Sequence, residues 1–121
     1  MLKHHLDRAS GILTLAPDGP LGAEDFAALA REVDPFIAER GSLAGLLIQA
    51  RAFPGWEDFP AFLGHLGFVR DHVARVRRVA IATDSNLLAL VPQVAGFFVH
   101  AEVRHFAWAD CDAAIAWLAR P

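Results

Sequence analysis

The sequence has little cysteine, no long apolar run and no excess of positive charge. Its single cysteine, Cys111, cannot form an internal disulfide, and this suits a reducing compartment. No apolar run approaches the roughly 18 residues of a membrane span. The first residues, MLKHHLDR, turn polar too early for a signal peptide. We therefore expect a cytoplasmic protein.

The balance of charge excludes one class of partner. The formal net charge is -3 and the isoelectric point is about 6.0. A domain that binds nucleic acid normally carries a basic face, so no nucleic-acid partner is expected. The same balance weakly opposes electrostatic attraction to anionic membranes.

Apolar side chains, by contrast, are abundant. They make up 55% of the 121 residues, above the roughly 45–50% of an average protein. A chain of this length suits one domain, residues 1–121, which buries about two thirds of the surface of the unfolded chain. We expect the apolar surplus to line a groove or an interface.

Turn residues divide the chain into segments that alternate between the apolar periods of strands and of helices. Strands are predicted at residues 2–7, 11–16, 43–49, 77–83 and 101–108. Helices are predicted at residues 23–40, at 58–75, from the caps at 84–86 to about 98, and after the cap Asp110. Segments 43–49 and 77–83 lack polar alternation and should be central strands, whereas 101–108 alternates like an edge strand.

This order of elements predicts an α/β domain. Repeated strand–helix units give a mostly parallel, five-stranded sheet with right-handed crossovers, about four helices and an antiparallel N-terminal edge strand. If each strand joins beside the last, the sheet is singly wound and all crossover helices lie on one side. Within the first helix, Pro35 is expected to cause a kink near Asp34, and Gly41 to end the helix.

A series of short motifs runs along nearly the whole chain. They are Glu24-Asp25-Phe26; Phe53, Gly55 and Trp56; Phe68, His72, Arg78 and Ala80; Ala101-Glu102-Val103-Arg104 and Phe106; and Ala114 with Trp117-Leu118. Together they resemble the SpoIIAA-like branch of the STAS fold, named for anti-sigma-factor antagonists. The resemblance implies a βα superhelix, shared with lipid-carrying CRAL-TRIO domains, and no enzymatic activity. Members of this branch have been suggested to bind apolar ligands or to associate with membranes.

One departure from the family pattern bears on regulation. The phosphorylated anti-sigma antagonists carry an Asp-Ser-Ser-like site where the third strand meets the second helix. Here the residues from Gln49 to Trp56 read QARAFPGW, with no Ser or Thr. We therefore do not expect partner switching by phosphorylation at this position.

The residues capable of catalysis or metal binding have simpler explanations. His65 and His72 are seven residues apart, which spans about 10 Å of helix and is too far for one metal ion. Cys111 sits between two aspartates that should raise its pKa, so it is interpreted as structural. No metal, cofactor or catalytic residue is predicted, and an enzyme that uses the loop 56–58 is the weakest alternative.

A basic cluster precedes the fourth strand. It consists of Arg70, Arg75, Arg77 and Arg78. We interpret it as a solvated helix end whose arginines complement the helix dipole. A phosphate or headgroup contact is the less favoured alternative.

The apolar surplus is concentrated in the expected second and third helices. Residues 87–99, LLALVPQVAGFFV, carry no charge and contain the helix-weakening Pro92. A helix that is apolar all round must be covered. We predict that an apolar, acyl-type ligand or lipid, or a membrane surface, covers these helices; the alternative is a protein–protein interaction module or a homodimer. The predicted groove is lined by Trp56, Phe62, Leu66, Leu87, Val91, Val94 and Phe98.

Overall fold

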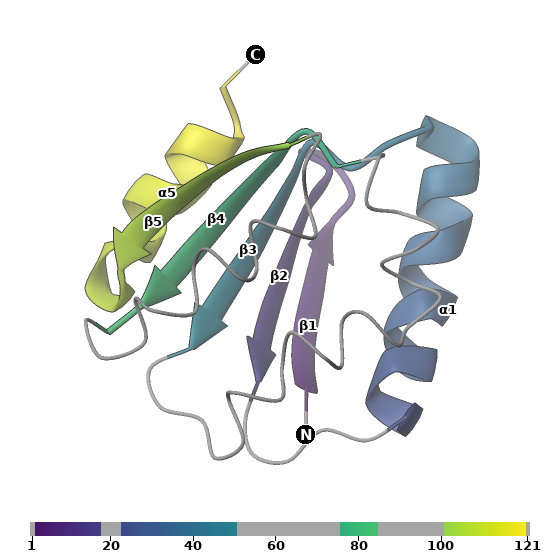
Figure 1. Cartoon of the computed structure of the whole chain (residues 1–121). Helices are drawn as coiled ribbons and strands as arrows, with labels where there is room; N and C mark the ends of the chain where they lie inside the picture. The colour runs from purple at the N-terminus through teal and green to yellow at the C-terminus, as the bar shows by residue number, and fades with distance from the viewer. Residues whose placement is uncertain (1, 18–22, 51–75, 85–100, 121) are drawn as a thin grey trace.

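The computed structural model describes residues 2–17, 23–50, 76–84 and 101–120 (Figure 1). Its strands are β1 (Leu2–Asp7), β2 (Ile12–Pro17), β3 (Gly45–Ala50), β4 (Arg78–Thr83) and β5 (Glu102–Ala107). Its helices are α1 (Ala23–Arg40) and α5 (Cys111–Leu118), and the 3-10 turn η4 (Trp108–Asp110) leads into α5. The helices expected at 58–75 and up to residue 98 lie outside the described residues.

The five strands form one sheet in the order β1-β2-β3-β4-β5. β1 runs antiparallel to β2, and every other neighbouring pair is parallel. This confirms the predicted sheet, with its antiparallel N-terminal edge strand, its interior strands β3 and β4 and its edge strand β5. The consecutive order is that of a singly wound sheet. Only one crossover helix, α1, belongs to the described residues, so the side taken by the other two stays a prediction.

The strand register assigns each side chain to one of two faces. One face carries buried residues from β1 to β4, namely Leu6, Leu13, Leu15, Leu46, Ile48, Val79, Ile81 and Thr83. His4 shares this face, and its Nδ1 lies 3.1 Å from Oε2 of Glu32 in α1. We therefore call this the α1 face.

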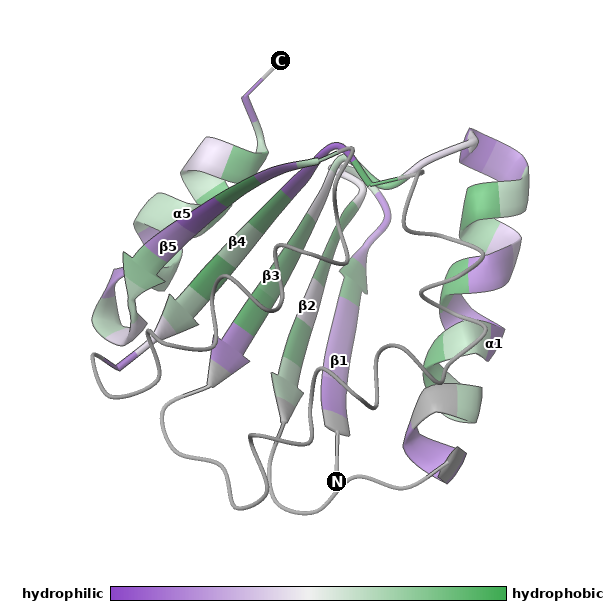
Figure 2. Ribbon diagram, in the orientation of Figure 1, coloured by the Kyte–Doolittle hydropathy of each residue, from purple (hydrophilic) through white to green (hydrophobic). Residues whose placement is uncertain are grey.

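The other face packs against the C-terminal helix. Its buried residues Ile12, Leu47, Ala80 and Ala82 form one cluster with Ala114, Trp117 and Leu118 of α5. We call it the α5 face, and Figure 1 shows α5 behind β4 and β5. Figure 2 shows that β2, β3 and β4 are largely hydrophobic, whereas hydrophilic residues occur along the edge strands. The two described helices thus cover opposite faces of an apolar sheet.

Helix α1 has the predicted bounds. Its buried residues are Leu29, Val33, Phe36 and Ile37. The helix is a single element through Pro35, which lies on its exposed side. Gly41 has a φ of +86° and its N–H donates to the carbonyl of Ile37 at 2.7 Å. This left-handed cap ends the helix where the sequence predicted.

Asp7 organises the turn between β1 and β2. Its Oδ1 accepts hydrogen bonds from the N–H groups of Ala9 at 3.0 Å and Ser10 at 3.3 Å. Gly11 follows with a φ of +75°, and its N–H donates to the carbonyl of Asp7 at 2.8 Å. The backbone donors lower the pKa of the Asp7 carboxyl, because they stabilise its charged form.

The close approach of α5 to the sheet depends on a glycine. A Cβ atom at Gly45 in β3 would lie 2.9 Å from Cβ and Cδ2 of Leu118. That is closer than side-chain carbons normally pack, so alanine at this position would push α5 away from β3.

Candidate functional site

The carboxyl ends of β4 and β5 bring two polar side chains to the α1 face. Thr83 is the last residue of β4 and is 1% exposed. His105 pairs with Ile81 in the parallel ladder, and Ile81 lies two residues before Thr83 on the same face. Diagonal neighbours of this kind have Cα atoms about 7–8 Å apart. One small chemical group placed over Ile81 can therefore reach both side chains.

Each of these two side chains has one buried polar atom without a hydrogen bond in the described part of the chain. Thr83 Oγ1 and His105 Nε2 are both buried, and within the described part of the chain neither atom makes a hydrogen bond. An unpaired buried polar group costs about 1–3 kcal/mol, and such groups are rare in native proteins. Ligand sites of α/β sheets are found outside the carboxyl ends of the strands. Two unpaired groups at this end of one face therefore mark a candidate ligand site.

The rest of this face is an apolar floor. Its side chains in β3 and β4 are Leu46, Ile48, Val79 and Ile81, and all four are buried. Val103 extends the same face onto β5, where it is half-buried. The four buried side chains are at most 2% exposed without any ligand, so the chain itself covers this part of the face.

His4, on the same face at the opposite edge of the sheet, has a different role. Its Nδ1 lies at an ion-pair distance from the carboxylate of Glu32, although the two groups are not aligned for a hydrogen bond. We give more weight to the short distance, because a small rotation of the ring would align the pair. The Nδ1 atom of His4 thus has a partner in α1, whereas the Nε2 atom of His105 has none among the described residues.

Cys111 is unsuited to nucleophilic catalysis. Its Sγ donates a hydrogen bond to the carbonyl of Trp108 at 3.1 Å. Burial raises the pKa of the thiol, and the charges of Asp112 and Asp110 raise it further. The predicted rise in the pKa of Cys111 is confirmed, and its structural role stays an interpretation. Asp110 occupies the predicted N-cap position of α5, but its side chain makes no capping hydrogen bond there.

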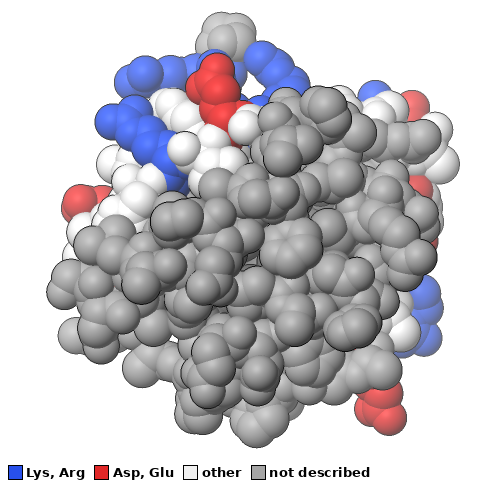
Figure 3. Space-filling view, viewed as in Figure 1, with Lys and Arg blue, Asp and Glu red and all other residues white. Residues whose placement is uncertain are grey.

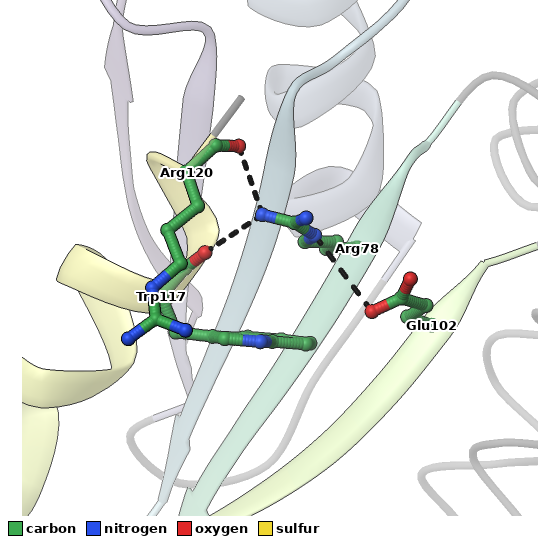
Figure 4. Close-up of polar contacts among 4 residues, drawn as sticks. All are labelled: Arg78, Glu102, Trp117 and Arg120. Atoms are coloured by element: carbon green, nitrogen blue, oxygen red, sulfur yellow. Dashed lines mark hydrogen bonds and ion pairs between the residues drawn. The ribbon is translucent and has the colours of Figure 1, made fainter.

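Arg78 binds the end of α5 and not the end of the helix expected at 58–75. The guanidinium of this first residue of β4 donates to the carbonyls of Trp117 at 3.0 Å and Arg120 at 2.8 Å, at the end of α5 (Figure 4). Its Nε lies 3.8 Å from Oε2 of Glu102, and the group stacks over the Trp117 ring. The sequence predicted a solvated helix end for this cluster, but the Arg78 side chain is only 16% exposed and lies in β4, where it binds the end of α5. Arg70 and Arg75 lie outside the described residues.

A second arginine flanks the same tryptophan. The guanidinium of Arg104 lies 5.2 Å from the ring centre of Phe106 and 5.9 Å from that of Trp117. Figure 3 shows basic side chains gathered at the upper left with an acidic one among them. Because Arg78 and Arg104 both contact Trp117 of α5, we interpret these two arginines as part of the docking of α5.

The groove predicted from the sequence is not among the described residues. All seven of its residues, Trp56, Phe62, Leu66, Leu87, Val91, Val94 and Phe98, lie outside the described ranges, as do His65 and His72. Within those ranges, no group of three His, Cys, Asp or Glu side chains could hold a metal ion. No helix in the same part of the chain is long and apolar enough to cross a membrane.

Sequence reasoning missed Thr83 and His105. One signal was present, because Thr83 ends a strand whose preceding residues VAIA are all apolar. His105 stands at an inward position of an alternating strand. Neither signal shows that the two strands are neighbours or that both side chains occupy one face, since this follows only from the register.

Comparison with protein families confirms the resemblance found in the sequence. The family model described as SpoIIAA-like matches residues 12–119. Neither the curated proteins nor the solved structures give a significant match. The matched range begins with β2 and ends one residue beyond α5, so it includes four of the five strands. The chain therefore belongs to the SpoIIAA-like family.

Proposed function

We propose that this protein is a non-catalytic STAS-type domain that holds an apolar, acyl-type ligand over the α1 face of its sheet. STAS-type domains are generally regulatory and non-enzymatic, and the chain belongs to a family of this type. The observation that carries the proposal is the uncharged, largely apolar segment 87–99, which requires cover. Two buried polar atoms without hydrogen bonds, Thr83 Oγ1 and His105 Nε2, lie on the α1 face near the ends of the strands that flank this segment.

The topology supports a groove on this face. Helix α1 connects β2 to β3 on the α1 face. Because parallel crossovers are almost always right-handed, the connections from β3 to β4 and from β4 to β5 are expected on that same side. Those connections carry the predicted groove residues, from Trp56 to Phe98. The proposal thus brings the predicted groove and the observed floor together.

Apolar contact is the expected source of affinity. Each ~100 Å² of apolar surface covered by a ligand contributes roughly 2.5 kcal/mol. Residues 87–99 carry no charged side chain, so salt should have little effect on binding. A free fatty acid and a bilayer surface both present acyl chains, and the experiment must separate these two sources.

The test uses paired substitutions in the predicted groove. We expect Val94→Asp with Phe98→Asp to abolish binding of a dansyl-labelled fatty acid, because each change buries a charge against an apolar ligand. Phosphatidylcholine liposomes form the second arm, and both arms are repeated at high salt. The matched control is Ile115→Asp, since Ile115 is an apolar residue on α5 that is 40% exposed. The control should bind as the wild type does.

The two probes and the oligomeric state together distinguish the proposal from the alternative of a protein–protein interaction module. Binding of the free fatty acid without liposome binding indicates a carried ligand, and binding of liposomes indicates a membrane surface. Binding of neither probe by the wild type, together with a tight dimer that Val94→Asp and Phe98→Asp dissociate, would replace the proposal with a protein–protein interaction module.

A further inference from the structure

We infer that β5 is a docking surface for a second copy of this chain, which adds its own β5 antiparallel to the first. β5 is the last strand in the order of the sheet, so one of its two edges is not paired with any described strand (Figure 1). An unpaired edge presents a row of backbone donors and acceptors, and this row is a template for another strand. The inference concerns assembly and does not depend on the ligand proposed above.

Two of the usual protections of an edge strand are missing from β5. Its six residues contain no proline, and all six pair with β4 in an unbroken register, without a bulge. Proteins normally keep an edge from pairing by such features, by charged side chains or by a covering segment. The two charged side chains of β5 are not covered, because Glu102 is 72% exposed and Arg104 is exposed as well. They are of opposite sign, so they can attract a second copy of the same strand.

The hydrogen bonds to β4 determine which residues of β5 face the open edge. The N–H of Glu102 donates to the carbonyl of Arg77 at 3.1 Å. Alternate residues of a strand direct their backbone groups to the same side, so Glu102 and Arg104 both direct theirs toward β4. The backbone groups of Val103 and His105 are therefore directed to the open edge, where they can pair with a second strand.

Charge selects one register among those that two-fold symmetry allows. A symmetric antiparallel pair places one residue opposite its own copy. With Val103 at this centre, Glu102 lies opposite Arg104 of the second copy, and the same contact occurs again on the other side of the axis. With Glu102 or Arg104 at the centre, like charges would meet. With His105 at the centre, Arg104 would lie opposite Phe106, and no opposite charges of the two strands would meet.

The selected register also brings the charged side chains close together. Because its backbone groups face the open edge, Val103 forms the hydrogen-bonded pair at the centre. Glu102 and Arg104 then form non-hydrogen-bonded pairs, whose Cα atoms are about 4.5 Å apart. Opposite charges at such positions stabilise the pairing. Arg104 is suited to this contact, because the described contacts of its guanidinium are with the aromatic rings of Phe106 and Trp117.

Sedimentation velocity over a series of protein concentrations measures the dimer. We expect the wild type to dimerise as the concentration rises. Glu102→Arg and Arg104→Glu should each raise the dissociation constant about tenfold, because two attractive pairs become repulsive in every dimer. The double variant restores opposite charges and should recover most of the wild-type affinity. The matched control is Glu39→Arg, a charge reversal at an exposed position of α1, which should dimerise as the wild type does.

A disulfide cross-link tests the register in a Cys111→Ser background. Val103→Cys should form a linked dimer on mild oxidation, because the two central Cα atoms would lie about 5.5 Å apart, within the range of a disulfide. The matched control is Ala107→Cys, at the exposed end of the same strand. Its two copies would lie roughly 25 Å apart along the strands and should not cross-link.

A wild type that stays monomeric at every concentration would overturn the inference. A dimer that neither Glu102→Arg nor Arg104→Glu weakens, or that the double variant does not restore, would overturn it as well. Urea unfolding shows whether each variant is folded. Where a charge-reversed variant does not fold, the cross-link decides: absence of a linked dimer for Val103→Cys, or efficient linking of Ala107→Cys, would contradict the pairing.

Discussion

At the scale of single residues, Asp7 shows how one side chain fixes a turn. Its carboxylate holds the backbone N–H groups of Ala9 and Ser10, and Gly11 provides the left-handed conformation that the turn requires. The turn is the only link between the consecutive strands β1 and β2, so its geometry sets how the two strands pair. The turn therefore fixes the register of β1 against β2, and this register places His4 on the face that α1 covers.

We expect Asp7→Ala to lower the urea midpoint of unfolding at neutral pH. The folded-state pKa of Asp7 lies below the ordinary value of 3.8, so its stabilising contribution is present above pH 3.8 and is lost as the pH falls through the folded-state pKa. The difference between wild type and Asp7→Ala should therefore shrink in acid. Asp7→Asn keeps the acceptor oxygen without the charge and should show a smaller loss that does not depend on this pKa. Identical midpoints for Asp7→Ala and wild type at neutral pH would contradict the account.

Residue roles were predictable where they depend on near neighbours in the chain. Gly41 as a helix end followed from adjacent residues. The direction of the pKa shift of Cys111 also followed from its neighbours Asp110 and Asp112, although burial is its largest cause. In α5 the apolar residue Ile115 is exposed, whereas Trp117 is buried. The sequence of a short helix does not determine which of its sides faces the sheet. In α5 that side is set by the close packing of Leu118 on Gly45 and by the hydrogen bond from Arg78 to the Trp117 carbonyl.

At the scale of elements, the attachment of α5 depends on its last carbonyl groups. A helix leaves its final carbonyls without intrahelical partners. From the start of β4, Arg78 donates to one of them, the carbonyl of Trp117, and to the carbonyl of Arg120 just beyond the helix, while its guanidinium stacks over the Trp117 ring. Arg78 therefore links β4 to two residues that lie 39 and 42 positions later in the sequence.

Replacing Arg78 with Ala should destabilise the protein by about 2 kcal/mol, the usual range for hydrogen bonds from a charged donor. Arg78→Lys keeps the charge but not the forked geometry, so we expect it to recover only part of the loss. The control is Arg104→Ala, which removes a cation stacked near the same ring and should cost less. Urea unfolding followed by tryptophan fluorescence measures all three. A loss for Arg104→Ala equal to that for Arg78→Ala would show that stacking, not the carbonyl contacts, attaches α5.

At the scale of the whole molecule, the position of a strand in the sheet was predictable from its pattern of apolar and polar residues. Buried runs marked β3 and β4 as interior, alternation marked β5 as an edge, and the structure confirms both. The observed strands differ from the predicted ones by one or two residues at an end. The candidate site was less predictable, because Thr83 and His105 come together through the pairing of two strands separated by residues 84–101. Local periodicity contains no information about such pairing.

Native mass spectrometry of the gently purified protein tests the central claim most directly. The account predicts that each chain carries an additional mass equal to that of one acyl-type molecule, which is released when the protein is denatured. The double variant with Val94→Asp and Phe98→Asp should carry less of this mass than Ile115→Asp when both are purified in the same way. A stable dimer without any small molecule would contradict the account.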